Sequence, residues 1–373
     1  MRLRITPTPG TEVASEDPLP PRGLVDRLRT RSTGEPTGAQ PPCFTRQDIR
    51  VGSVRLCEVW SEVTDTFGSA LASPAMANFS GKPRSDLSIT PATELSLSGR
   101  KAVVVGGTDG LGRELARYLA ARGASVTVVG RTFRDEGTPG IDFLKADLSL
   151  MAEGRRVGRT LPAEELDFVF LTTGIIAAPK REVTAEGLER DMAVSFLSRL
   201  AILRELAPRM AAAPLARRTR PRLYVMGFPG TNEKGDLEDL NAERSYEPMR
   251  VHMSTVAGNE ALVLEFARRY PTLDFYGLNP GLIQTKIRSN YLGEGSLKHR
   301  VVEWLIGLTM MSAEQYAQRM VPVLLSPSIE GRSPVMFNQK GRAIEASPAL
   351  GDGYAGRFIT ASEQLVDRAL AST

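Results

Sequence analysis

From residue 95 onward, short runs of apolar residues alternate with longer segments in which apolar and polar positions mix. The run KAVVV at 101–105 is almost continuously apolar, as expected for a parallel strand buried on both faces. The pattern predicts strands at 101–105, 125–129, 141–146, 167–172, 222–226 and 273–278, and helices at about 111–122, 184–212 and 253–269. This β-α alternation implies right-handed crossovers. We therefore expect an α/β fold, a doubly wound (Rossmann) parallel sheet in a single domain.

Residues 1–95 follow no such pattern. Proline, serine, threonine and glycine are frequent, and no stretch keeps a strand or helix period for long. A segment of this kind buries too little apolar surface to offset the entropy that it loses on ordering. Two interpretations remain, a disordered leader or a start codon assigned too early, with Met76 as the natural start. We therefore divide the chain into an N-terminal segment, 1–95, and one folded domain, 96–373.

Composition narrows the class of protein. The chain has 373 residues, a net charge of +4 and 42% hydrophobic residues, an ordinary proportion for a globular domain. Its arginines are scattered and form no basic stripe with interleaved aromatic residues, so nucleic-acid binding has no support. No run of 18 apolar residues occurs, and the basic start lacks the apolar core of a secretory signal. We expect no membrane span and a cytoplasmic location.

Cysteine and histidine are too few for two kinds of site. Cys43 and Cys57 both precede the predicted domain, and His252 and His299 are the only histidines of the chain. The domain therefore offers neither a disulfide framework nor the ligand spacing of a zinc site.

A glycine-rich turn lies between the first predicted strand and its helix. It reads Gly106-Gly107-Thr108-Asp109-Gly110-Leu111-Gly112 and has the spacing G-x-x-x-G-x-G. The first glycine permits a tight turn, the second lets the backbone approach a pyrophosphate, and the third lets helix and strand pack closely. The helix N-terminus adds free N–H groups and the positive end of its dipole. The turn predicts a dinucleotide site, although glycines also occur in such turns for geometry alone.

The ends of the next two strands indicate which nucleotide binds. NAD sites usually place an acid after the second strand, whereas this chain has Gly130 and Arg131 there. Glycine carries no charge to repel a 2′-phosphate, and a guanidinium pairs with one, so we predict NADP as the cofactor. The alternative for Arg131 is an ordinary surface arginine. Asp147, followed by Leu148, ends the third strand and is either an acceptor for the adenine amino group or the N-cap of the next helix.

Four segments resemble the short-chain dehydrogenase/reductase family, in the style of its retinol-dehydrogenase-like members. They are VVVGGTDGLGRELA at 103–116, ADLSL at 146–150, LTTGIIAAPKREVTAEGLERDMAVSFLSRL at 171–200 and LNPGLIQTKI at 278–287. Residues 312–337 also look like the family's last helix and strand, so the resemblance covers roughly 98–340. It implies an NADP(H)-binding domain with a small-molecule substrate, and a homo-oligomer through the long helices after the fourth and fifth strands.

The resemblance also implies roles for single residues. Gly174 would border the cofactor, and residues 286–311 would form a substrate lid. The positions by the nicotinamide would be Pro280, Gly281 and Thr285.

The family's proton-transfer residues are a Tyr-x-x-x-Lys pair, a serine and an asparagine, where the lysine lowers the pKa of the tyrosine. Aligned on this pattern, the tyrosine position falls on His252 and the lysine position on Val256. The serine position falls near Phe228, and the asparagine position on Ser195. The resemblance therefore implies a degenerate catalytic tetrad.

Two groups are candidates for the missing proton transfer. His252 has a reference pKa near ~6.5 and needs no lysine at neutral pH, although it is alternatively a helix-start residue without chemistry. Tyr246 and Arg250 have i, i+4 spacing, although Pro248 between them indicates a loop or a first helical turn. We expect an NADP(H)-dependent oxidoreductase that acts on a carbonyl or alcohol. The alternative is a non-catalytic NADP(H)-binding protein, a sensor or a partner subunit.

Overall fold

The computed structural model describes residues 50–51, 54–55, 81–213, 219–281 and 311–372. The chain divides into two units, Met1–Asp48 and Ile49–Thr373, and every element below belongs to the second. The first pair of strands in the chain is antiparallel and consists of β1 (Arg50–Val51) and β2 (Val54–Arg55). Most of the N-terminal segment lies outside the described residues, so both interpretations of it stay predictions.

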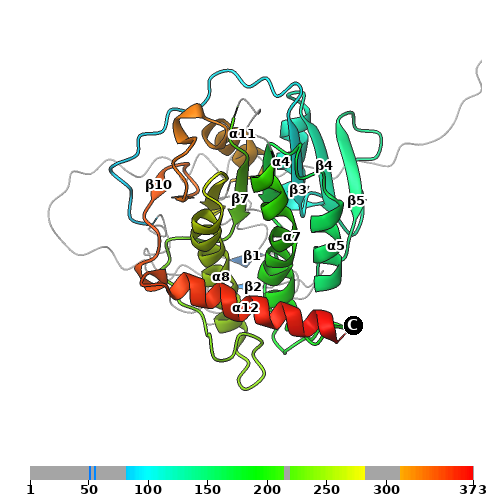
Figure 1. The fold of residues 1–373 in the computed structure, drawn as a ribbon, viewed down its shortest axis with the longest axis vertical. Coiled ribbons are helices and arrows are strands. Elements are labelled where there is room, and N and C mark those ends of the chain that lie inside the picture. Colours follow the sequence, from blue (N-terminus) through cyan, green and yellow to red (C-terminus); the bar gives the residue numbers. More distant parts are fainter. Residues whose placement is uncertain (1–49, 52–53, 56–80, 214–218, 282–310, 373) are drawn as a thin grey trace, which may run out of the picture. The chain divides into compact units, whose positions relative to one another are not determined.

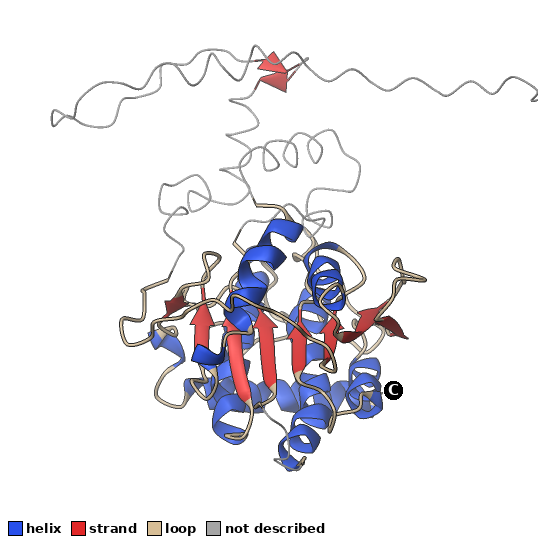
Figure 2. Ribbon diagram, turned by 90° about the horizontal axis from the view of Figure 1, so that it is seen from above, coloured by secondary structure: helices blue, strands red, loops and turns tan. Residues whose placement is uncertain are grey.

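An eight-stranded sheet forms the centre of the second unit (Figure 2). Its strands are β3 (Lys101–Val105), β4 (Ser125–Gly130), β5 (Ile141–Lys145), β6 (Phe168–Leu171), β7 (Arg222–Met226), β8 (Asp274–Leu278), β9 (Val335–Phe337) and β10 (Ala343–Ile344). Their spatial order is β10-β9-β8-β7-β6-β3-β4-β5, and only the β9–β10 pair is antiparallel. The chain runs outward from β3 to β5 and then crosses back to β6 on the other side of β3. This reversal confirms the predicted doubly wound Rossmann sheet.

Helices cover both faces of this sheet (Figure 1). The helices are α4 (Gly110–Ala120), α5 (Met151–Thr160), α6 (Arg190–Met192), the π-helix η2 (Ala193–Leu197), α7 (Ser198–Ala212), α8 (Pro248–Arg269), α11 (Ala313–Leu324) and α12 (Tyr354–Ala371), with short 3₁₀ turns η4 (Pro327–Ile329) and η5 (Pro348–Leu350). Residues of α4 and α11 share one buried cluster, and residues of α5, α7, α8 and α12 share the other. Within the described part of the chain, no helix is long and apolar enough to cross a membrane.

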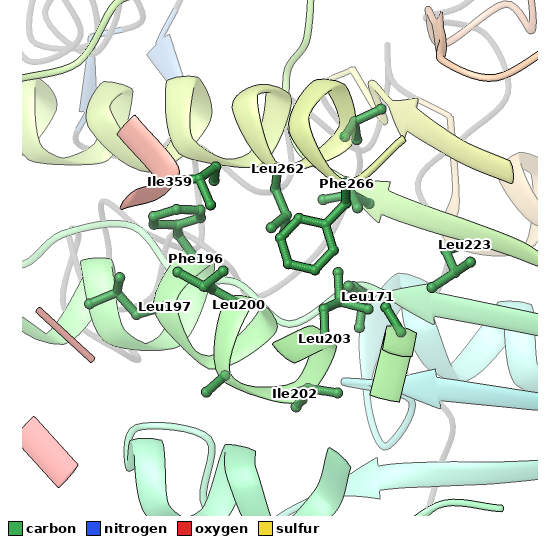
Figure 3. Close-up of a cluster of buried hydrophobic side chains, with 14 of the residues drawn as sticks. Leu171, Phe196, Leu197, Leu200, Ile202, Leu203, Leu223, Leu262, Phe266 and Ile359 are labelled. Carbon is green, nitrogen blue, oxygen red and sulfur yellow. The ribbon is translucent and has the colours of Figure 1, made fainter. Parts of the chain in front are cut away.

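The cluster on the α7–α8 side contains some of the largest buried side chains (Figure 3). Phe196 and Leu200 face Leu262 and Phe266 across the gap between the two helices, above Leu171 of β6. All five side chains are at most 1% exposed. Burying an aliphatic or aromatic side chain of this size contributes about 1.5–3 kcal/mol, so this layer fixes how α7 and α8 lie on the sheet.

Two predicted helices have different boundaries in the structure. The helix expected at 184–212 begins only at Arg190, because residues before it form a β-bridge between Val183 and Glu189. The helix expected to begin at 253 begins at Pro248, where the side chain of Glu247 accepts hydrogen bonds from the first free backbone N–H groups. Proline suits this first position because its missing N–H would have no helical partner. His252 therefore lies inside the helix.

The C-terminal helix α12 was not among the predicted elements. It crosses α8, α7 and α5 (Figure 1) and contributes Phe358 to the core, where its ring meets that of Phe196 at 5.8 Å. An ion pair of 2.7 Å between Arg204 and Asp367 joins α7 to the same helix. Part of the surface of α7 and α8 is therefore covered from within the chain. The predicted homo-oligomer through these helices stays a prediction.

Residues 81–95, which the sequence analysis assigned to the N-terminal segment, contact the folded domain. The backbone N–H of Arg84 donates to Ala343 of the edge strand β10 at 3.0 Å, and Ala92 donates to Pro322 of α11 at 2.8 Å. Leu87 and Ile89 pack against the cluster on the α4–α11 side. The packed part of the chain thus begins before residue 96, because this segment pairs with an edge strand that would otherwise expose its backbone.

Candidate functional site

The glycine turn has the backbone conformation that its glycines were expected to permit. Gly106 and Gly110 have φ values of +86° and +52°, which residues with a Cβ rarely adopt. A Cβ at Gly106 would lie 2.7 Å from the backbone nitrogen of Thr173, and one at Gly112 would collide with the Gly106 carbonyl. The turn is therefore packed against the end of β6, where a side chain at Gly106 or Gly112 has no room.

Helix α4 opens directly from this turn. Asp109 is its N-cap, and the Oδ1 atom of Asp109 accepts a hydrogen bond of 2.9 Å from the backbone of Gly110. Leu111, the next residue, is half-buried against the α4–α11 cluster. A Cβ at Gly130 would lie 2.6 Å from the Thr108 hydroxyl, so Thr108 lies against the end of β4. The turn, the helix N-terminus and the second strand thus meet as a dinucleotide site requires.

The residues predicted to read the nucleotide lie at the ends of β4 and β5. Arg131 is exposed, and within the described residues no acidic side chain pairs with it. Its neighbour Arg134 instead forms an ion pair with Asp109. Asp147 is exposed and accepts hydrogen bonds from the backbone and hydroxyl of Ser149 at 3.0 and 2.8 Å, whereas Leu148 is buried. Leu150, not Asp147, occupies the N-cap of α5.

The positions implied by the family resemblance are described in part. Gly174 is half-buried in the loop after β6, which adjoins the glycine turn through Thr173. Pro280 and Gly281 follow β8, and the backbone N–H of Gly281 donates to the Asn279 side chain at 2.7 Å. Thr285 lies outside the described residues, as does the predicted lid up to residue 310.

His252 has a buried carboxylate partner. Its Nδ1 atom lies 2.8 Å from Oδ2 of Asp191, whose side chain is fully buried, while the imidazole is 22% exposed. The other oxygen of Asp191 accepts from the Ser195 hydroxyl at 2.5 Å. Burial by itself lowers the pKa of His252, but the charge of Asp191, the hydrogen bond to it and the charge of Glu189 raise that pKa by more, so the net shift is upward.

The local helix geometry explains how Asp191 and Ser195 come together. Ser195 lies within the π-helix η2, a wider turn that is uncommon and often found at functional sites. The Ser195 hydroxyl also accepts a hydrogen bond of 3.0 Å from the backbone N–H of Ile175, just after Gly174. Ser195 therefore joins the carboxylate that holds His252 to the loop after β6.

The second predicted pair, Tyr246 and Arg250, is not brought together. The Tyr246 hydroxyl donates to the Ala178 carbonyl at 2.5 Å, and Arg250 pairs with Asp236 at 2.6 Å. Burial raises the pKa of Tyr246, and the charge of Glu189 raises it further. Tyr246 lies before helix α8, so the i, i+4 relation that the sequence suggested is not realised on one helix face.

Two more ionisable groups, which act on His252 or on its partner Asp191, were not found by sequence reasoning. Glu189 is the N-cap of α6 and accepts from the backbone of Met192 at 2.7 Å, and burial together with the charge of Asp191 raises its pKa to about 7. Arg199 is 3% exposed and donates to the carbonyls of Thr173 and Met226 and, at 2.7 Å, to Asn259 Oδ1. Burial lowers the pKa of Arg199 to about 9.

A signal for part of this cluster was present in the sequence. Asp191, Ser195 and Arg199 are spaced at four-residue intervals, which places all three on one face of a helix. The spacing shows that they are neighbours, but not which distant residue they meet. Their contact with His252 depends on how α6 and α8 pack, 61 residues apart along the chain.

The glycine turn and the His252 cluster lie at the same edge of the sheet. The turn follows the carboxyl end of β3, Thr173 follows that of β6, and Met226 ends that of β7. Thr173 touches the turn through its backbone nitrogen and binds Arg199 through its carbonyl. Ligands of doubly wound sheets bind at this edge, near the point where the strand order reverses. Within the described residues, no cluster of acidic, histidine or cysteine side chains is suited to a metal ion.

Comparison with known proteins identifies a family model and several relatives that this chain resembles. Residues 100–217 match the family model described as short chain dehydrogenase. An uncharacterized oxidoreductase of Saccharomyces cerevisiae is 46% identical over 281 residues, 74% of this chain and 91% of that protein. Polyprenol dehydrogenase of Mus musculus is 28% identical over 255 residues, 62% of this chain and 73% of that protein.

Among solved structures, a crystal structure of an uncharacterized protein from Mycobacterium Paratuberculosis has the same fold. It has a TM-score of 0.54 and 22% identity, and the match covers 75% of this chain and 98% of that one. Together with the extended identity to the yeast protein, these findings confirm the resemblance seen in the motifs: the chain belongs to the short-chain dehydrogenase/reductase family of oxidoreductases.

Proposed function

We propose that this protein is an NADP(H)-dependent oxidoreductase that interconverts a carbonyl compound and an alcohol, with His252 as its proton-transfer group. The observation that carries the proposal is the contact of 2.8 Å between His252 Nδ1 and the buried carboxylate of Asp191. A histidine held in this way has a fixed orientation and a raised pKa, as a general acid near neutral pH needs. The proposal thus gives His252 the part that the family's tyrosine plays, in a tetrad otherwise replaced.

The fit of a dinucleotide rests on the packing of the glycine turn. Gly106 and Gly112 have no room for a Cβ, because Thr173 and the Gly106 carbonyl lie against them, so the turn stays tight, and α4 begins directly after it with a helix N-terminus suited to an anion. We assign the pyrophosphate to residues 106–112, the adenine to Asp147 and Leu148, and the nicotinamide side to Gly174, Pro280, Gly281 and Thr285. The bound nicotinamide supplies or accepts the hydride.

The selection of NADP over NAD rests on Arg131. Its side chain is exposed after the end of β4, and no acidic residue of the described chain neutralises it. A free guanidinium at that position favours a 2′-phosphate over a bare ribose hydroxyl.

The proton step follows from the hydrogen bond of His252. A carboxylate only accepts hydrogen bonds, so Nδ1 of His252 donates to Asp191, and Nε2 is left to exchange a proton with the substrate. In reduction, Nε2 gives its proton to the carbonyl oxygen, and the imidazole becomes neutral. In oxidation, the neutral Nε2 takes the proton of the alcohol. The name of the mouse relative, polyprenol dehydrogenase, supports an alcohol or carbonyl substrate.

The test is NADPH oxidation by purified protein with a broad panel of aldehydes and ketones. We expect turnover of at least one substrate, and loss of about 10²- to 10⁴-fold in kcat in His252→Ala with NADPH affinity retained. The reductive rate should fall as pH rises through the raised pKa of His252, because only the protonated imidazole gives a proton.

Tyr246→Phe is the matched comparison, because Tyr246 is the other candidate acid and its hydroxyl is engaged by Ala178. We expect it to keep most of the activity. Activity that survives His252→Ala but disappears in Tyr246→Phe would overturn the assignment. Tight NADPH binding with no turnover of any panel substrate would instead favour the non-catalytic NADP(H)-binding protein.

A further inference from the structure

The buried guanidinium of Arg199 is the feature of the site that the proposed reaction does not yet use. It is 3% exposed and bonded to two backbone carbonyls and an asparagine, all of them neutral acceptors. Its Nε atom has no hydrogen-bond partner among the described residues. Removing a charged group from water costs several kcal/mol unless an opposite charge compensates it. A cation in this place needs a reason beyond packing.

Asp191 lies eight residues earlier on the same helical segment, and its charge attracts the guanidinium of Arg199. Asp191 is itself fully buried, and its two oxygens are occupied by His252 and Ser195. When His252 is protonated, its charge compensates the carboxylate. When His252 gives up its proton, a buried carboxylate remains whose only partners are neutral, unless another cation lies close by.

We infer that Arg199 is a positioning residue that compensates the charge of Asp191 while His252 gains and loses its proton, and that holds the ends of β6 and β7 together. This inference rests on the proposed role of His252. Without the guanidinium, the cluster would retain the proton on His252 more tightly, because a positive charge that opposes the protonation of the imidazole would be gone. Arg199 thus lets the imidazole release its proton without leaving an uncompensated charge.

The hydrogen bonds of Arg199 support the second part of this role. They join Thr173 at the end of β6 to Met226 at the end of β7, and Asn259 of α8 binds the same guanidinium. Asn259 also donates to the backbone carbonyl of Ser195 at 3.0 Å. One cation therefore connects two strand ends with the helices that carry His252 and Asp191.

The other ionisable groups around His252 come from the elements packed against it. The start of α6 supplies Glu189 together with Asp191, and the loop before α8 supplies Tyr246. Arg181 acts on Glu189 and Tyr246 from the loop after β6. Since none of these residues is changed in the variants below, a shift in the titration of His252 that occurs in the uncharged variant and not in the charged one reports the loss of the guanidinium charge.

The test uses the small number of histidines in this chain. In a His299→Gln background, His252 is the only histidine, so its imidazole gives a single NMR signal that can be followed against pH without any substrate. Arg199→Gln removes the charge but keeps an N–H donor for the strand ends. Arg199→Lys keeps the charge with fewer donors and serves as the matched control.

We expect the titration midpoint of His252 to move upward by about one pH unit in Arg199→Gln and to stay near the parent value in Arg199→Lys. A midpoint that is the same in Arg199→Gln as in the parent overturns the inference, as does an equal upward shift in Arg199→Lys. Should Arg199→Gln fail to fold, Arg199→Met carries the same expectation, since its flexible, unbranched side chain fills a similar volume and, like glutamine, carries no charge.

The result of this titration can be distinguished from the result of the activity assay that tests the proposed function. A shifted midpoint in a protein that turns over no substrate supports the role of Arg199 and contradicts the oxidoreductase proposal. If turnover depends on His252 but the titration midpoint of His252 is the same with and without Arg199, the proposed function is supported and the role of Arg199 is overturned.

Discussion

The glycine turn and the His252 cluster lie at the same edge of the sheet, but they are built in opposite ways. The turn consists of seven consecutive residues whose conformation follows from glycine at fixed spacing, with φ of +86° at Gly106. The cluster joins Asp191 to His252 across 61 residues and depends on the packing of two helices. The first is a local property of the chain, and the second exists only after folding.

The glycine turn and the His252 cluster also have different proposed roles, nucleotide binding for the first and proton transfer for the second. The turn has the glycine spacing from which we propose that the nucleotide binds here. The cluster joins a histidine on α8 to a carboxylate on α6, and we propose that this pair takes the part of the family's tyrosine and lysine. In the proposed mechanism the charge beside His252 comes from α6 rather than from its own helix, and the inferred role of Arg199 adds a contribution from α7. The comparison suggests that nucleotide binding and proton transfer can be broken separately.

Asp191→Asn is expected to give the largest difference between the loss of catalysis and the loss of NADPH binding. The amide keeps the shape and a hydrogen-bonding atom but removes the charge that raises the pKa of His252. We expect kcat for carbonyl reduction to fall by about 10²- to 10³-fold, with the Kd of NADPH changed less than threefold or so. Steady-state kinetics and calorimetry on the same protein measure the two quantities. An equal loss in both would show that the regions are not separable.

Gly106→Ala is expected to affect the other region, with a loss of about 10²-fold in NADPH affinity rather than in proton transfer. A methyl group there would lie 2.7 Å from the Thr173 nitrogen, so the turn has to move out of its position. NADPH affinity should fall by about this factor, while the titration of His252 stays near that of the parent.

Gly99→Ala is the matched control, because Gly99 has a similar φ of +76° but no atom within 4 Å of the added Cβ. Both substitutions lose about 1–2 kcal/mol to the left-handed backbone conformation, measurable by urea unfolding. Only Gly106→Ala should lose NADPH affinity. Equal losses of affinity in the two variants would attribute the effect to stability rather than to the site.

The smallest effect concerns Arg131, which acts on one phosphate at the rim of the nucleotide site. Arg131→Asp should change the ratio of NADPH to NADH affinity by about tenfold or more in favour of NADH. Arg131→Lys should keep most of the preference, because the charge remains. Calorimetric Kd values for both cofactors measure the ratio, and an unchanged ratio in Arg131→Asp would show that Arg131 does not select the cofactor.

Much of the fold could be predicted because its signals are local. The buried strands at 101–105 and 222–226 were predicted at the residues where the structure has them, since central parallel strands are continuously apolar. The start of α8 was misplaced by five residues, because the capping of a helix by Glu247 and Pro248 is weaker in the sequence than the apolar period that follows. Helix α12 was missed because its period begins after a glycine-rich loop, beyond the part that resembles the family.

The sequence by itself determined the parallel strands β3 to β8, the glycine turn and the candidate proton donor His252, because periodicity, glycine spacing and residue type act over a few neighbouring residues. Only the tertiary structure decided that His252 faces Asp191 rather than solvent, and that Tyr246 is bonded to a backbone carbonyl. It also decided that Arg199 is buried among strand ends. Those three facts depend on burial and on contacts between distant segments, which arise when α6, α7 and α8 pack together on the sheet.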